Sequence, residues 1–103
     1  MADVAERFGR FEEQIGLAVT AIESDSGASP VLVAVVREFQ GKAVKAKSAL
    51  NGEERAVRDA VLEVEQAGDS AKAAAEADPG VGDAAKQAVL DAHLSICILK
   101  SKL

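Results

Sequence analysis

The sequence predicts an all-α protein, a single-domain up-down-up-down antiparallel four-helix bundle that spans residues 1–103. Apolar residues recur in alternating steps of three and four through each long segment, which keeps them on one stripe of a helix. Short groups of turn-forming residues separate these segments, and the sign of the charge alternates from one segment to the next. Four apolar stripes leave water only by covering one another.

The first two helices are predicted over residues 3–25 and 30–50. The turn between them contains Ser-Asp-Ser-Gly-Ala, after which Ser29 and Pro30 supply a helix cap and a proline suited to the first helical position. The first stripe consists of Val4, Phe8, Phe11, Ile15, Ala18 and Ile22. The second consists of Leu32, Val36, Phe39, Ala43, Ala46 and Leu50.

The other two helices are predicted over residues 52–77 and 81–101, after the Asn51-Gly52 turn and the Asp-Pro-Gly-Val-Gly turn at residues 78–82. Gly68 is a weak point inside the third helix, because glycine costs about 1 kcal/mol relative to alanine there. A kink or break at residues 68–70 is therefore one expectation. The alanine-rich end at residues 71–88 buries little area per residue, so we expect it to be the less stable end.

Charge supports antiparallel neighbours. The acid-rich segments 1–29 and 51–80 alternate with the net basic segments 30–50 and 81–103. Short connections place sequential helices side by side and antiparallel. Opposite net charges on neighbouring helices favour that order modestly.

Composition excludes some classes of function. Twelve basic residues against seventeen acidic ones, with no Trp or Tyr, argue against nucleic acid as a partner. No apolar run approaches the length of a membrane span, and no secretory signal precedes the first helix, so we expect a soluble, cytoplasmic protein. The single Cys97 fits a reducing compartment. The final Ser101-Lys102-Leu103 matches the peroxisomal import tripeptide, which makes a peroxisomal location the alternative in a eukaryote.

Two stretches carry more apolar surface than one core face uses. Residues 31–36 are apolar all the way round a helix, and a buried strand is an alternative there because many are β-branched. Residues 90–99 add a second apolar stripe beside the core stripe. Such surplus surface indicates a partner, although a more central place in the bundle is an alternative. The predicted interface residues are Val31, Val33, Val35, Leu90, Leu94, Cys97 and Ile98.

His93 and Cys97 lie four apart on one helical face, which makes them candidates for binding a metal ion such as Zn²⁺. Asp91, Glu63 and Glu65 are expected in the same region. A structural zinc site needs about four ligands, which a dimer with both pairs apposed could complete. The alternative is a buried thiol beside a histidine at a polar boundary. We predict no catalytic residue and no cofactor.

The sequence thus predicts a non-catalytic helical module for protein–protein interaction, which docks an apolar helix face against a second copy or a partner helix. A homodimer is the first expectation, because two-fold dimers are the commonest closed assemblies. One alternative is a bundle that binds a metal or small ligand through His93 and Cys97. Others are a secreted helical effector and a peroxisomal matrix protein.

Overall fold

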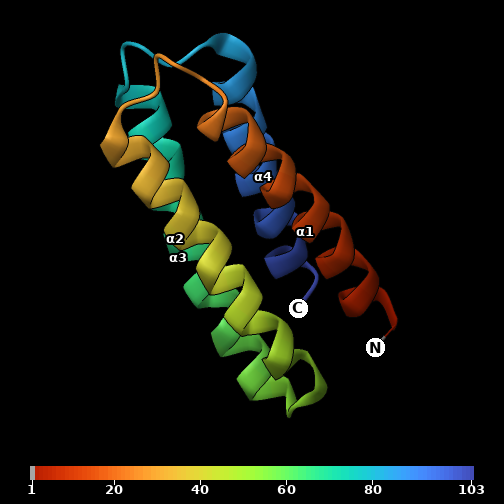
Figure 1. Cartoon of the computed structure of the whole chain (residues 1–103). Helices are drawn as coiled ribbons and strands as arrows, with labels where there is room; N and C mark the ends of the chain where they lie inside the picture. The colour runs from red at the N-terminus through yellow and green to blue at the C-terminus, as the bar shows by residue number, and fades with distance from the viewer. Residues whose placement is uncertain (1) are drawn as a thin grey trace.

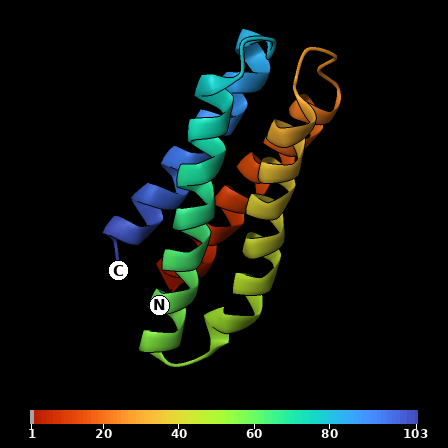
Figure 2. The ribbon, with the colours of Figure 1, turned by 90° about the vertical axis from the view of Figure 1, so that its left-hand side faces the viewer.

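The computed structural model describes residues 2–103, with side chains from Val4 onward, and it confirms the four-helix bundle. The helices are α1 (Ala2–Glu23), α2 (Pro30–Lys47), α3 (Glu54–Ala77) and α4 (Asp83–Ser101), and a short 3₁₀ helix, η1 (Ser48–Asn51), follows α2. Sequential helices run antiparallel, and α4 returns to lie beside α1, which closes the ring (Figures 1 and 2). The molecule measures 41 × 19 × 18 Å. No helix in the described part of the chain is both long and apolar enough to cross a membrane.

The apolar stripes predicted for the first, second and fourth helices form the core. The stripe predicted for the third helix is partly wrong, because α3 buries Val61, Gly68 and Ala75, whereas Ala60, Ala67 and Ala74 of the predicted stripe are half-buried. Residues 31–36 belong to α2, so the strand alternative is wrong. As predicted, Pro30 begins this helix, and the Ser29 hydroxyl oxygen accepts a hydrogen bond of 3.2 Å from the Leu32 N–H. The largest fully buried side chains come from all four helices: Phe8, Phe11, Ile22, Leu32, Val36, Phe39, Val61, Val64, Val89, Ile96 and Leu99.

The expected break at Gly68 is wrong, because α3 continues without interruption from Glu54 to Ala77. Gly68 is buried against the Phe39 ring, and an added Cβ would lie only 3.0 Å from Phe39 Cζ. The Phe39 ring centroid lies 5.5 Å from that of Phe11, which lies 5.6 Å from that of Phe8. The missing side chain at position 68 therefore makes room for one of the three aromatic rings of the core.

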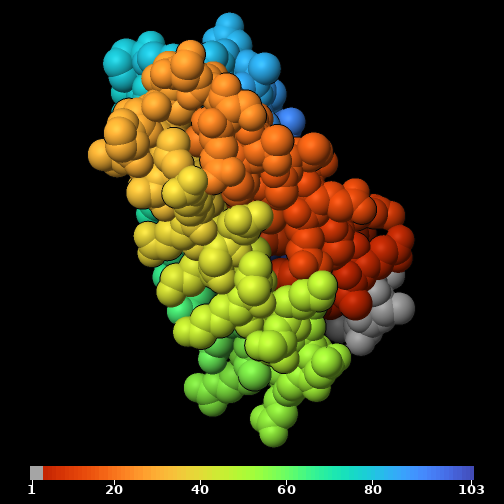
Figure 3. Space-filling view, in the orientation of Figure 1, coloured from red at the N-terminus to blue at the C-terminus, as the bar shows by residue number. Residues whose placement is uncertain are grey.

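Two connecting loops lie against each other at one end of the bundle (Figure 3). One Asp25 carboxylate oxygen accepts from the N–H of Gly27 in its own loop at 2.8 Å, and the other accepts from Gly82 in the opposite loop at 2.9 Å. A Cβ on Gly27 would overlap the carbonyl oxygen of Gly80, and a Cβ on Gly80 would overlap that of Gly27. Glycine is required here by the close approach of two backbones.

Asp78 makes the reciprocal contacts. Its carboxylate accepts from Gly80 in its own loop at 2.9 Å and from Ser29 in the opposite loop at 2.8 Å. These bonds, with that from Ser29 foremost, lower the pKa of Asp78 below its ordinary value of 3.8, because they stabilise the ionised form. The end that sequence analysis expected to be less stable is thus tied by hydrogen bonds between its two loops.

The two helical hairpins repeat one pattern. We name α1 and α2 the first hairpin and α3 and α4 the second hairpin. Adding 53 to the number of each buried residue in the first hairpin gives a buried residue in the second. The same shift converts the ion pair of Glu12 with Lys47, at 3.4 Å, into that of Glu65 with Lys100, at 3.0 Å. It also converts Asp25 to Asp78, Gly27 to Gly80 and Leu50 to Leu103. The reciprocal loop contacts therefore relate the hairpins by an approximate two-fold axis.

Ion pairs cross between neighbouring helices as the charge pattern predicted. Arg37 of α2 contacts Glu23 of α1 at 2.7 Å, and Lys42 of α2 contacts Glu63 of α3 at 3.6 Å. All of these side chains are substantially exposed, so each pair contributes at most about 1 kcal/mol. Their role is to favour the observed order of helices over others.

We predict that Gly80→Ala destabilises the fold by roughly 1–3 kcal/mol, because the two loops must separate to admit the methyl group. The matched control is Gly41→Ala in α2, where an added Cβ meets nothing within 4 Å. The free energy of unfolding of the control should rise by about 0.5–1 kcal/mol, because alanine has a better helix propensity than glycine. Urea unfolding followed by circular dichroism measures both, and a Gly80→Ala protein as stable as the control would contradict the loop contact.

Candidate functional site

The first predicted surface, at residues 31–36, is largely used inside the bundle. Leu32 and Val36 are buried in the core, and Val33 and Val35 are half-buried against it. Val31, with 68% of its surface exposed, and the small Ala34 remain open to solvent. The alternative explanation, that this stretch lies more centrally in the bundle, therefore accounts for most of its apolar surface.

The second predicted surface keeps its apolar groups in solvent. Leu94 is 57% exposed and Ile98 is 43% exposed, while Leu90 and Cys97 are half-buried. Residues four apart share one side of a helix, so Leu90, Leu94 and Ile98 form a continuous row. We name Leu90, Leu94, Cys97 and Ile98 the α4 face.

Sequence analysis missed two other exposed apolar residues. Leu17 of α1 is 61% exposed and Val44 of α2 is 66% exposed. Both lie beside the buried stripes of their helices, and no second large apolar side chain of the same helix is exposed within a turn of either. Isolated apolar residues are normal on protein surfaces. These two positions therefore serve best as controls for the α4 face.

His93 is held by polar and apolar contacts between α3 and α4. Its ring is mostly buried, and its Nε2 atom lies 2.6 Å from an Asp69 carboxylate oxygen. Because an ionised carboxylate only accepts hydrogen bonds, Nε2 carries a proton and donates it to Asp69. Gly68 lets the ring approach α3, since an added Cβ would lie 3.2 Å from His93 Cδ2.

The residues expected around His93 are only partly those found there. Asp91 accepts a hydrogen bond from Gln87, and Glu63 pairs with Lys42 on the other side of α3. Glu65 does lie near Cys97, although it pairs with Lys100. Asp69, the actual partner of His93, was missed; folding the α3–α4 hairpin about residue 80 places it within one turn of His93. Among the side chains that the structure describes, residues 4–103, no three His, Cys, Asp or Glu side chains are grouped so as to hold a metal ion.

Cys97 is poorly suited to act as a nucleophile. Burial raises the pKa of its thiol above the ordinary value of 9.0, and the Glu65 carboxylate raises it further, so the thiol stays protonated. The sulfur lies 3.5 Å from His93 Nε2, but that nitrogen already donates to Asp69. The other ring nitrogen is 4.0 Å from the sulfur. This second nitrogen, Nδ1, is the one that accepts hydrogen bonds, and it lies at the outer limit of hydrogen-bond distance from the thiol, whose raised pKa keeps it protonated at neutral pH.

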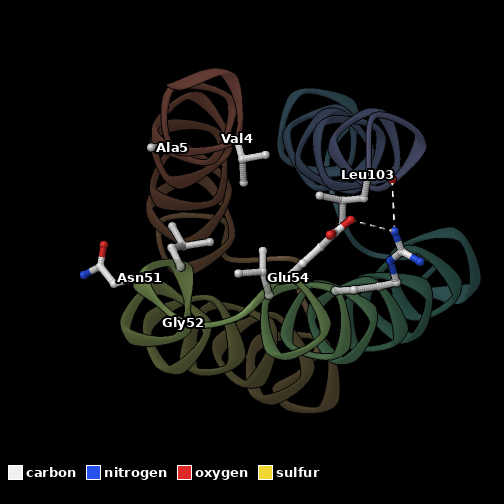
Figure 4. A pocket seen from close by; sticks show the side chains of 9 residues that line it. Val4, Ala5, Asn51, Gly52, Glu54 and Leu103 are labelled. Atoms are coloured by element: carbon white, nitrogen blue, oxygen red, sulfur yellow. Dashed lines mark hydrogen bonds and ion pairs between the residues drawn. The ribbon is translucent and has the colours of Figure 1, made fainter. Parts of the chain in front are cut away.

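A cavity of about 300 Å³ opens at the end of the bundle away from the loop contact (Figure 4). Arg58 lines it, and its guanidinium lies 3.6 Å from a Glu54 carboxylate oxygen and donates a hydrogen bond of 3.2 Å to the Leu103 carbonyl oxygen. Its apolar wall comes from Val4, Leu50, Val57 and Leu103. Among the described residues that line the cavity, the charged ones are Glu54 and Arg58, and they form an ion pair with each other.

Comparison with known proteins assigns no family to this chain. No protein family model matches the chain, and neither curated proteins nor solved structures show a significant match.

We predict that Cys97 reacts with an aromatic disulfide reagent only at higher pH than a free cysteine does. Reaction follows the thiolate, whose formation burial and Glu65 both oppose. Glu65→Gln should move the pH profile to lower pH, because it removes the nearby negative charge. Ser70→Ala, on the exposed surface of α3, is the control and should leave the profile unchanged. If wild-type Cys97 reacts at the same pH as free cysteine or at a lower pH, the assigned surroundings of Cys97 are contradicted.

Proposed function

We propose that this protein is a non-catalytic interaction module that forms a homodimer through the α4 face. The observation that carries the proposal is the exposure of Leu94 and Ile98 on one side of one helix. Burying a large aliphatic side chain is worth about 1.5–3 kcal/mol, so two such residues on each chain supply a driving force for association.

The charges beside this row favour an antiparallel pair of α4 helices about a two-fold axis. Asp91 and Lys102 are both exposed and are separated by 11 positions, which is close to three helical turns. They therefore lie in line on one flank of the row. In an antiparallel pair centred between Leu94 and Ile98, Asp91 of each copy lies opposite Lys102 of the other.

The same arrangement pairs Leu94 of one copy with Ile98 of the other. A two-fold axis makes each contact occur twice, so every favourable pair counts double. Cys97 and Leu90 lie on the other flank, where a second copy would complete their burial. The electrostatic pairs set the antiparallel direction, while the apolar row supplies most of the affinity.

The size of this surface indicates a modest affinity. Stable interfaces bury about 1,200–2,000 Å² in total, and a single pair of crossing helices lies at or below the low end of that range. We therefore expect a dissociation constant in roughly the micromolar range. At that affinity, the fraction of protein in the dimer rises with protein concentration.

We predict that wild-type protein shows a mass that rises from one chain to two with concentration, measured by light scattering after size exclusion. Detection uses refractive index, because the chain has no Trp or Tyr. Leu94→Glu combined with Ile98→Glu should weaken association by about a hundredfold or more, since each change removes an apolar contact on both copies. Leu17→Glu combined with Val44→Glu is the matched control and should dimerise as the wild type does.

Charge reversal tests the direction of the pair. Asp91→Lys places lysines opposite each other and should weaken the dimer, whereas adding Lys102→Asp to it should restore association. A wild type that stays monomeric at high concentration would contradict the homodimer. Loss of association in the Leu17 and Val44 control alone would place the interface elsewhere.

A further inference from the structure

The core positions related by the shift of 53 differ systematically in size. Over most of the bundle the first hairpin carries the larger residue and the second the smaller one. Near the end of α2 the order reverses, with alanines in the first hairpin and larger residues in α4. The eight unequal pairs are Phe8 with Val61, Phe11 with Val64, Ile15 with Gly68, Ile22 with Ala75, Leu32 with Ala85, Phe39 with Ala92, Ala43 with Ile96 and Ala46 with Leu99. The other two pairs, Ala18 with Ala71 and Val36 with Val89, are identical.

This difference prevents either hairpin from pairing with its own kind. In a pair of first hairpins, Ile15 would occupy the place of Gly68, where even a Cβ lies 3.0 Å from the Phe39 ring. In a pair of second hairpins, Ala92 would stand in the place of Phe39 and leave a cavity beside Gly68. Overpacking and cavities both destabilise a core. A complete bundle therefore needs one first hairpin and one second hairpin.

Only one short segment joins the two hairpins. We name residues 48–53 the hinge: η1 contains no buried residue, and Gly52 and Glu53 are exposed with extended backbone angles. The loop contacts and the core lie between hairpins and do not depend on which chain supplies each hairpin. Opening the hinge thus exposes no fully buried residue, and its main loss is the packing of the half-buried Leu50 against the core.

We propose that a second copy of this chain can supply either hairpin, so that two copies exchange hairpins about the hinge and form a dimer of two complete bundles. Exchange of this kind reuses contacts that the monomer already makes, with the hinge as the segment that changes conformation. The surface involved is the hairpin–hairpin interface, which is distinct from the α4 face.

The test is a deletion of residues 48–53, which joins Lys47 directly to Glu54. Without the hinge the chain cannot easily turn back between α2 and α3, so the deletion favours one continuous helix. It is made with Leu94→Glu and Ile98→Glu, so that association through the α4 face does not contribute. Insertion of Gly-Ser-Gly-Ser after Gly52 in the same background is the matched control. We expect the deletion to have twice the mass of one chain with unchanged helix content, and the control to have the mass of one chain. A folded, monomeric deletion would overturn the proposal.

A cross-link identifies exchange directly. Lys42 of α2 and Glu63 of α3 lie 3.6 Å apart across the hairpin–hairpin interface, which suits a carbodiimide that joins amines to carboxylates. Equal amounts of ¹⁴N and ¹⁵N deletion protein are unfolded together, refolded and cross-linked. Exchange predicts Lys42–Glu63 peptides of mixed isotope, which Lys42→Gln abolishes. A dimer whose Lys42–Glu63 peptides are all of one isotope would overturn the proposal.

A permuted chain decides the matter if the deletion does not fold. It runs from residue 54 to 103, continues through Asn-Gly-Glu, and ends with residues 1–50, which gives the α4–α1 junction the connection that α2 and α3 have. The shift of 53 makes these junctions equivalent, so we expect wild-type helix content and a melting temperature within a few degrees. An unfolded permuted chain would overturn the interchangeable pairing of hairpins.

Discussion

The fit of the Phe39 ring over Gly68 is the constraint on which the rest of the structure depends. A glycine in the middle of a long helix opposes helix propensity, and α3 tolerates it because the absent side chain admits an aromatic ring from α2. The same absence lets His93 of α4 approach α3. One small residue therefore fixes how three helices meet.

That fit also determines which hairpin packs against which. Two hairpins with the same pattern of buried positions and reciprocal loop bonds could in principle pair in several ways. The large residues of one and the small residues of the other leave a single combination that fills space without overlap. Specificity in this bundle thus comes from steric complementarity, while the exposed ion pairs add little energy.

Much of the fold could be predicted from the sequence because its signals are local. Apolar spacing located the four helices and the buried positions of α1, α2 and α4, although in α3 it missed Val61, Gly68 and Ala75; Ser29 and Pro30 marked where α2 begins. Long-range contacts left no such signal. The loop bonds of Asp25 and Asp78 connect segments far apart in the chain, and the role of Gly68 depends on a ring from another helix.

The candidate site was predicted less completely for the same reason. Apolar periodicity identified Leu94 and Ile98, which are exposed, but it could not show that Val33 and Val35 find cover within the bundle. The neighbourhood of His93 depends on the register of α3 against α4. A small shift in that register exchanges Glu63, which was expected there, for Asp69, which is found. Asp91 is not a neighbour because residues two apart lie on different sides of one helix.

The free energy of unfolding of Gly68→Ala tests the central packing constraint most directly. The account predicts a loss of about 1–3 kcal/mol although alanine is the better helix former, because the methyl group meets the Phe39 ring. It further predicts that Phe39→Leu costs less in the Gly68→Ala protein than in the wild type, since the two changes share one space. A Gly68→Ala protein as stable as the wild type, or more stable, would contradict it.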